Sequence, residues 1–187
     1  MTKLRIPPIA TAPSSEVAEL LAKAPSLDGR PLNIFGTLAH HPLLLRRYLA
    51  LGSVFLTFNL LPPREREIVI LRMAWRAGSV YEFGQHTRLG RAAGLSEQEI
   101  ARAARAALDG WAEPDAMLLR MVDELHSADI VSDPTWAALA SRWSEPELLE
   151  LLALAGFYRM TAGLLNSAGV EAEPGVPGWP PGTVPGR

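Results

Sequence analysis

Two long apolar runs and a regular set of helix-ending residues dominate the pattern along the chain. Residues 148–165 are apolar on almost all sides, and residues 68–75 are similarly apolar. No proline occurs between Arg64 and Glu113, whereas Pro, Gly and Ser divide the rest of the chain at intervals typical of helix ends. No segment alternates between apolar and polar residues with hairpin turns at its ends. The pattern therefore predicts helices without a significant sheet.

Caps and prolines predict the helix boundaries. Proline suits the first turn of a helix, serine caps helix starts, and glycine ends helices. Ser96, with Glu99 three residues later, has a capping-box pattern. Eight or nine helices with short turns follow, which is an all-α bundle. The expected helices are 16–24 after Ser14 or Ser15, 33–58 with a break at Pro42, 64–77 before Gly78, 79–93 before Gly94, one after Ser96, 114–127, 133–143, and 145–168 between Ser144 and Gly169.

The longest apolar run has two interpretations. A membrane-spanning helix needs about 20 apolar residues, and Glu150 and Arg159 interrupt residues 148–165. The other interpretation, which we favour, is a helix buried in the core or between subunits. Two helices this apolar in a small chain lead us to expect a homo-oligomer and no membrane partner.

Three segments differ in composition. Residues 1–28 form a Pro-containing arm with one short helix, residues 29–170 form the helical domain, and residues 171–187 contain five Pro and four Gly. We expect this tail to lie on a surface or to be disordered, and to contribute little to the core. The first residues have no apolar signal region, so a cytoplasmic location is expected.

Composition narrows the possible chemistry. The 187 residues carry a net charge of −2, which gives no indication of a nucleic-acid partner. The chain has no cysteine, which excludes disulfides, thiolate nucleophiles, cysteine–zinc sites and dithiol peroxidase chemistry. Lysine occurs only at Lys3 and Lys23, before the expected main body, so a Schiff-base lysine in that body is not expected.

His86 has the most informative surroundings of the four histidines. On a helix that begins at Ser79, Ser79, Glu82 and His86 share one face, with Tyr81 and Gln85 beside them. A carboxylate one turn from an imidazole can orient it, fix its tautomer and raise its pKa, which suits proton transfer near neutral pH. The same stretch, SVYE, is also a capping-box pattern, in which Ser79 and Glu82 only stabilise the helix start. The sequence leaves both interpretations open.

Glu67 lies inside a very apolar helix. A buried carboxylate needs a partner and often has a shifted pKa. Its role is either functional or limited to an ion pair with Arg64, Arg66 or Arg72.

The other histidines point to structural roles. His40 and His41 are adjacent and diverge on a helix, so we expect them at a helix end rather than at a metal site. His126 lies near a helix C-terminus, where the helix dipole favours an imidazolium. No metal site is therefore predicted.

Several segments occur in a recognisable order: FGTLAHHP (35–42), LPPREREIVILR (61–72), AGSVYEFGQH (77–86), AAGLSEQEI (92–100) and FYRMTAGLLN (157–166). Together they resemble the carboxymuconolactone decarboxylase family, which shares its fold with alkylhydroperoxidase D-like proteins. The resemblance covers about residues 29 to 170. It implies an all-α helical bundle with a pocket near a subunit interface, in a homo-oligomer built from trimers or dimers.

The resemblance also matches individual residues of this chain to the motif of the peroxidase branch. In the peroxidase branch, a glutamate is followed by Cys-x-x-Cys and by a histidine four residues after the second cysteine. Glu67 and His86 match the glutamate and the histidine, whereas Ser79 and Glu82 occupy the cysteine positions. Peroxide reduction by the dithiol route is therefore not available to this chain.

The resemblance implies cofactor-independent acid–base chemistry on a small carboxylated or lactone-like substrate, as in a decarboxylase-like lyase. His86 would act as general acid or base, Glu82 would orient it, and Glu67 would complete a proton relay. Tyr81 could donate a hydrogen bond to a developing enolate.

Substrate binding has its own candidates. An arginine, Arg72 or Arg88, could hold a substrate carboxylate, and Ser79 lies on the same helix face as the catalytic candidates. The alternative function is a non-catalytic ligand-binding or scaffold protein that keeps the fold.

Overall fold

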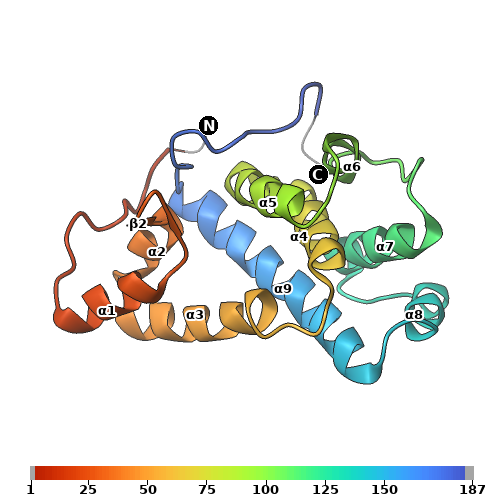
Figure 1. The fold of residues 1–187 in the computed structure, drawn as a ribbon, viewed down its shortest axis with the longest axis horizontal. Helices are drawn as coiled ribbons and strands as arrows, with labels where there is room; N and C mark the ends of the chain where they lie inside the picture. Colours follow the sequence, from red (N-terminus) through yellow and green to blue (C-terminus); the bar gives the residue numbers. More distant parts are fainter. Residues whose placement is uncertain (1–2, 184–187) are drawn as a thin grey trace.

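Nine α-helices and one short β-hairpin make up residues 3–183, which the computed structural model describes (Figure 1). Residues 1–2 of the expected arm and residues 184–187 of the expected tail lie outside the described residues. The elements are α1 (Ser15–Lys23), β1 (Ser26–Leu27), β2 (Arg30–Pro31), α2 (Asn33–Leu38), α3 (Pro42–Leu56), α4 (Pro63–Arg76), α5 (Val80–Ala92), α6 (Glu97–Ala103), α7 (Glu113–Ala128), α8 (Asp133–Ala140) and α9 (Glu145–Ala168).

The predicted helix boundaries are confirmed to within a few residues. Ser96 and Glu99 form the capping box at the start of α6, and Ser144 and Glu147 form another at the start of α9. Helix α9 ends at Gly169, whose left-handed φ of 71° suits a residue without a side chain. Capping residues and first-turn prolines together therefore mark most of the helix boundaries.

The β-hairpin is a difference from the sequence-based prediction. Its two strands have only two residues each and pair antiparallel. The turn residues Asp28 and Gly29 both have positive φ, 50° and 75°, which is the backbone geometry that an Asp-Gly turn favours. The turn signal is present in the sequence, but strands this short cannot show an alternating pattern.

Helix α4 lies at the centre of the fold. It packs chiefly against α5, α7 and α9, and every residue from Glu67 to Trp75 is buried. A helix that is apolar on all sides must be covered on all sides. The central position of α4 explains why this run carries so few polar residues.

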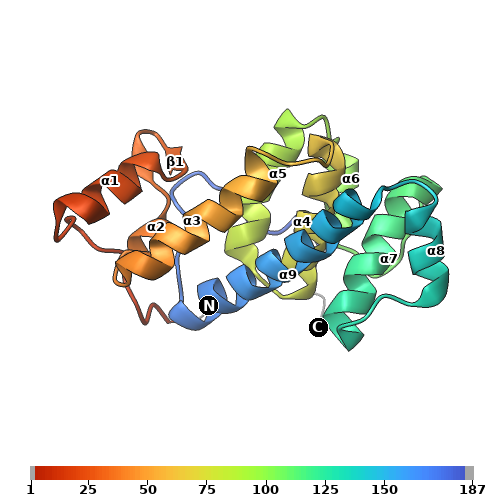
Figure 2. The same cartoon turned by 90° about the horizontal axis from the view of Figure 1, so that it is seen from below.

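Helix α9 runs through the middle of the molecule and contacts α3, α4, α5, α7 and α8 (Figures 1 and 2). By length and composition it is the one helix in the described residues that could cross a membrane. Half of its most apolar window is nevertheless buried against the rest of this chain. The structure therefore agrees with the interpretation of α9 as a core helix.

The segment after α9, residues 170–183, lies against α5. Trp179 packs on Phe83 with ring centroids 5.0 Å apart, and both contact the hydrophobic core. Gly84 permits this approach, because a Cβ there would clash with the carbonyl group of Pro177. The described part of the tail thus packs on the domain, which corrects the expectation that it contributes little.

Candidate functional site

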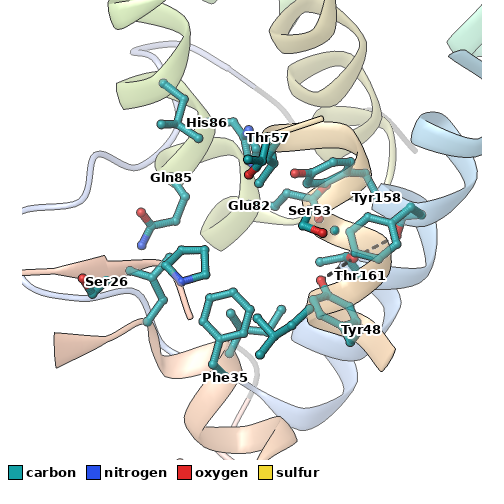
Figure 3. A pocket seen from close by; sticks show the side chains of 18 of the residues that line it. Ser26, Phe35, Tyr48, Ser53, Thr57, Glu82, Gln85, His86, Tyr158 and Thr161 are labelled. Carbon is teal, nitrogen blue, oxygen red and sulfur yellow. Dashed lines mark hydrogen bonds between the residues drawn. The ribbon is translucent and has the colours of Figure 1, made fainter. Parts of the chain in front are cut away.

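A cavity of about 700 Å³ lies between α5, the N-terminal helices and α9 (Figure 3). Most of its walls are apolar side chains from α1, α2, α3 and α9. Helix α5 adds a polar face, because Glu82, Gln85, His86 and Arg88 all line the cavity. An apolar pocket of this volume with a few convergent polar groups is typical of small-molecule sites.

A buried hydrogen bond orients His86. Its Nδ1 atom is 2.7 Å from Oε2 of Glu67 on α4, and Arg66 Nε donates to the other oxygen of Glu67 at 2.9 Å. Because a carboxylate only accepts hydrogen bonds, Nδ1 carries the hydrogen that Glu67 accepts. His86 also lines the cavity. The ring also packs edge-on against Tyr158, with centroids 4.8 Å apart. These contacts hold the imidazole in one orientation.

Glu82 is a buried carboxyl group whose oxygens have no hydrogen-bond partner among the described residues. Burial raises the pKa of Glu82 well above its ordinary value of 4.5, since desolvation penalises the charged form. A neutral Glu82 can donate its O–H to a ligand. Figure 3 shows Glu82, His86 and Tyr158 around the same end of the cavity.

The expected contact in which Glu82 orients His86 is therefore wrong. The orienting carboxylate is Glu67, from another helix and 19 residues away in sequence. Of the three arginines considered as partners of Glu67, Arg66 forms the ion pair. Glu67 consequently has both roles that the sequence left open, the ion pair and the contact to the candidate catalytic group.

Residues 42–118 match the sequence profile of the carboxymuconolactone decarboxylase family. The matched range runs from the start of α3 into α7 and contains both Glu67 and His86. A comparison with curated proteins finds no match.

Solved structures of alkylhydroperoxidase-like proteins have the same fold. A peroxidase-related protein from Silicibacter superposes with a TM-score of 0.80 at 15% identity, over 96% of this chain and 98% of that one. The alkylhydroperoxidase AhpD core protein of Ralstonia eutropha gives 0.77 at 17% identity, over 90% and 93%. A cysteine-to-alanine variant of the debrominase Bmp8, in complex with 2,3,4-tribromopyrrole, gives 0.74 at 14% identity, over 93% and 94%. Identities this low establish the fold alone.

The structure contradicts the capping-box interpretation of SVYE. Ser79 precedes α5, but its side chain makes no capping hydrogen bond, and its Oγ is buried without a partner. Glu82 does not reach back to the helix start, since neither of its oxygens is bonded. Ser79 also lies outside the cavity lining, so the structure does not place it where it would bind substrate.

Arg72 is also placed away from the cavity. Its fully buried guanidinium donates to both carboxylate oxygens of Asp123, at 2.7 and 2.6 Å, and to the carbonyl oxygen of Ala103. This arrangement ties α4 to α7 and to the chain after α6. Arg72 therefore has a structural role here, which corrects its assignment as a candidate for holding a substrate carboxylate.

Tyr81 and Arg88 both line the cavity. The Tyr81 hydroxyl donates to Glu173 at 2.9 Å and accepts from the backbone N–H of Ile34 at 3.3 Å, so it is occupied by the protein itself. Burial, reinforced by Glu173, raises the pKa of Tyr81. Arg88 is exposed, so it lies where the cavity meets solvent and remains a candidate for an anionic group of a ligand.

Several cavity residues are not among the site residues predicted from the sequence. Lys23 lines the cavity from the end of α1, although we placed both lysines outside the main body. Tyr48, Tyr158 and Thr161 also line it, and the hydroxyl groups of Tyr48 and Thr161 are 2.7 Å apart. Tyr158 and Thr161 belong to the family-like stretch FYRMTAGLLN, which was a usable signal. Lys23 and Tyr48 had no such signal.

The remaining histidines have structural contacts. His41 caps α3 by accepting from Leu44 N, and His40 Nε2 lies 3.0 Å from the carbonyl oxygen of Pro7. The pKa of His126 is lowered, first by burial and then by Arg159, so the expected dipole-favoured imidazolium is not supported. No group of three potential metal ligands of the His, Asp and Glu types occurs within residues 3–183.

Alanine substitutions of Ser79 and Ser96 test whether Ser79 acts as a helix cap. Ser79→Ala should leave the free energy of unfolding unchanged or slightly higher, because a buried hydroxyl without a partner contributes no hydrogen bond. The matched control, Ser96→Ala, removes a real capping box and should cost about 1 kcal/mol. Urea unfolding of both variants measures the difference. An equal loss in the two variants would restore the capping interpretation of Ser79.

Proposed function

We propose that this protein is a cofactor-independent, decarboxylase-like lyase acting on a small carboxylated or lactone-type substrate. The observation that carries the proposal is the presence of two acid–base groups, His86 and Glu82, at one cavity. His86 is anchored at Nδ1 by Glu67 and lines the cavity, and Glu82 is buried, unpaired and has a raised pKa. An oriented imidazole beside a carboxyl group with a raised pKa, both at an apolar pocket, is an arrangement suited to acid–base catalysis.

In the proposed reaction, the bond between the substrate carbon and its carboxylate breaks and CO₂ leaves. The bonding electron pair moves into an adjacent carbonyl and forms an enolate. The O–H of Glu82 hydrogen-bonds the enolate oxygen and stabilises the charge that develops there. Protonated His86 then delivers the Nε2 proton to carbon, and solvent restores that proton. No oxidant or reductant is consumed.

The walls of the cavity suit this step. Loss of a carboxylate disperses charge, and an apolar site that excludes water favours a reaction of this kind. A neutral Glu82 does not repel an approaching anion, whereas an ionised one would. Arg88 and Lys23, both exposed at the lining, supply the positive charge that attracts and orients a carboxylated substrate.

The competing hypothesis is a ligand-binding or scaffold protein without activity. Its support in the sequence was the double role of SVYE as a helix cap, and Ser79 makes no capping hydrogen bond. Catalysis therefore remains the better supported proposal, and the experiment below separates the two.

Carboxylated lactones and β-keto acids should first be screened for ligands that raise the melting temperature. With a substrate found, His86→Ala should lower kcat by about 10²–10⁴-fold, as expected for a general acid. Glu82→Met, which removes the O–H donor, should lower kcat by about 10²–10³-fold. Glu82→Gln should lose less, because its amide N–H still donates. Steady-state release of CO₂ measures all three.

Thr87→Val is the matched control. Thr87 follows His86 on α5 and is buried, but it does not line the cavity and its hydroxyl has no partner. It should retain the wild-type rate. Wild-type turnover by both His86→Ala and Glu82→Met would end the proposed mechanism, and binding without turnover by the wild-type protein would favour the ligand-binding function.

We also propose that the protein is a homo-oligomer, with α3 in the interface. Leu44, Leu51 and Val54 lie along one side of α3 and are each more than 40% exposed, and Phe58 just beyond the helix is 75% exposed. Monomers rarely leave contiguous apolar surface of this kind uncovered. Sedimentation should find an oligomer for the wild-type protein and a shift toward monomer for Leu51→Glu.

Ile130→Glu provides the control for that substitution. Ile130 is 68% exposed in the connection between α7 and α8, and these two helices lie apart from α3 (Figure 1). The Ile130→Glu substitution should leave the oligomer intact. A monomeric wild-type protein at micromolar concentration would contradict the proposal.

A further inference from the structure

Three hydrogen-bond donors converge on Glu173 in the segment after α9. The backbone N–H of Asn33 donates to Oε1 at 2.6 Å, and the Tyr81 hydroxyl donates to the same oxygen at 2.9 Å. The side-chain amide of Gln85 donates to Oε2. Tyr81 and Gln85 both line the cavity. Glu173 therefore joins the C-terminal segment to the polar wall of the site.

The contact with Glu173 determines how the Gln85 amide is turned. A carboxylate only accepts hydrogen bonds, so Nε2 must face Glu173 and Oε1 must face away from it. On that other side, NH1 of Arg88 donates to Oε1 at 3.4 Å. Among the described residues 3–183, Gln85 is the hydrogen-bond partner of the Arg88 guanidinium. The amide of Gln85 thus transmits the position of Glu173 to Arg88.

We propose that Glu173 is a positioning residue, which holds Arg88 through Gln85 and so gives the cavity its preference for anionic ligands. The inference rests on the proposed function in assigning an anionic group of the substrate to Arg88. It adds that the C-terminal segment, which the sequence suggested was dispensable, takes part in ligand selection.

The anchoring of the segment can be separated from the role of Glu173. Trp179 packs on Phe83, and the backbone at Pro177 lies against Gly84. These contacts do not involve Glu173, so its removal should leave the segment docked. Trp179→Ala tests the opposite case, because it weakens docking without changing the carboxylate.

Two fluorescent probes with the same aromatic body provide the test. Anilinonaphthalene sulfonate is an anion, and phenylnaphthylamine is its neutral counterpart. The wild-type protein should bind the anionic probe more tightly. Glu173→Ala should weaken binding of the anionic probe by about three- to tenfold, as for loss of one charge-assisted hydrogen bond, and leave the neutral probe unchanged.

The direction in which Glu173→Ala changes binding of the anionic probe distinguishes positioning from charge repulsion. Removing the negative charge of Glu173 should strengthen anion binding if only Coulomb repulsion matters, whereas positioning predicts weaker binding. The matched control, Glu171→Ala, removes the same charge from the same segment and keeps the backbone carbonyl that accepts from Asn33. It should not weaken binding of either probe.

A double-mutant cycle tests the route through Gln85. Arg88→Gln should show the same selective loss as Glu173→Ala, and the two substitutions together should lose no more than one alone. Gln85→Met, which keeps the side-chain length but removes the amide, should match them if Glu173→Ala impairs folding. Circular dichroism of each variant establishes that the fold is retained.

Four results would overturn the inference: unchanged or tighter binding of the anionic probe by Glu173→Ala, equal weakening of both probes, additive losses in the double mutant, or a wild-type protein that binds the anion no better than the neutral probe. Trp179→Ala should also weaken binding of the anionic probe, because Glu173 contacts Gln85 only while the segment is docked. None of these measurements requires turnover, so the proposed lyase activity stands or falls separately.

Discussion

The hydrogen bond between Glu67 and His86 connects the two helices on which the rest of the site depends. Glu67 is fully buried on the central helix α4, and His86 lies on α5 at the edge of the cavity. A buried carboxylate requires hydrogen-bond partners, and Arg66 and His86 each bind one of the two oxygens of Glu67. The same bond fixes the orientation of His86, which lines the cavity. One contact therefore satisfies the buried carboxylate and also orients the candidate acid.

Glu82, in contrast to Glu67, is a buried carboxyl group without a hydrogen-bond partner among the described residues. Most buried polar groups have a hydrogen-bond partner, and a group without one calls for an explanation. Above its ordinary pKa of 4.5, the unfolded chain loses the Glu82 proton while the folded chain keeps it, so this group lowers stability increasingly as the pH rises toward its folded pKa. A residue that costs stability in this way is a candidate for ligand contact.

Local signals in the sequence predicted the helices well and the contacts between them poorly. Ser96, Ser144 and Gly169 act within their own turns, so their roles could be inferred directly. The family-like spacing of Glu67 and His86 indicated two of the site residues. Which carboxylate meets His86 could not be inferred, because Glu82 at helical spacing and Glu67 on a neighbouring helix satisfy the same chemistry.

Other errors have the same physical origin. Arg72 was predicted to bind a substrate carboxylate. In the fold its guanidinium instead binds Asp123, which is 51 residues away in sequence. Lys23 and Glu173 come from segments that composition describes as peripheral, and each reaches the cavity or its wall only through long-range packing. Residue type and spacing thus indicate which groups can do chemistry, whereas their partners are set by tertiary structure.

The protonation state of Glu82 is the most direct test of this account. In the infrared spectrum at neutral pH, the wild-type protein should show the carbonyl stretching band of a protonated carboxylic acid, and Glu82→Gln should lack it. Glu99→Gln is the control and should retain the band, because the contacts of Glu99 with Ser96 and Arg64 lower the pKa of Glu99 to about 2. Absence of the band from the wild-type protein, or its persistence in Glu82→Gln, would contradict the central claim that Glu82 is a neutral, unpaired acid at the cavity.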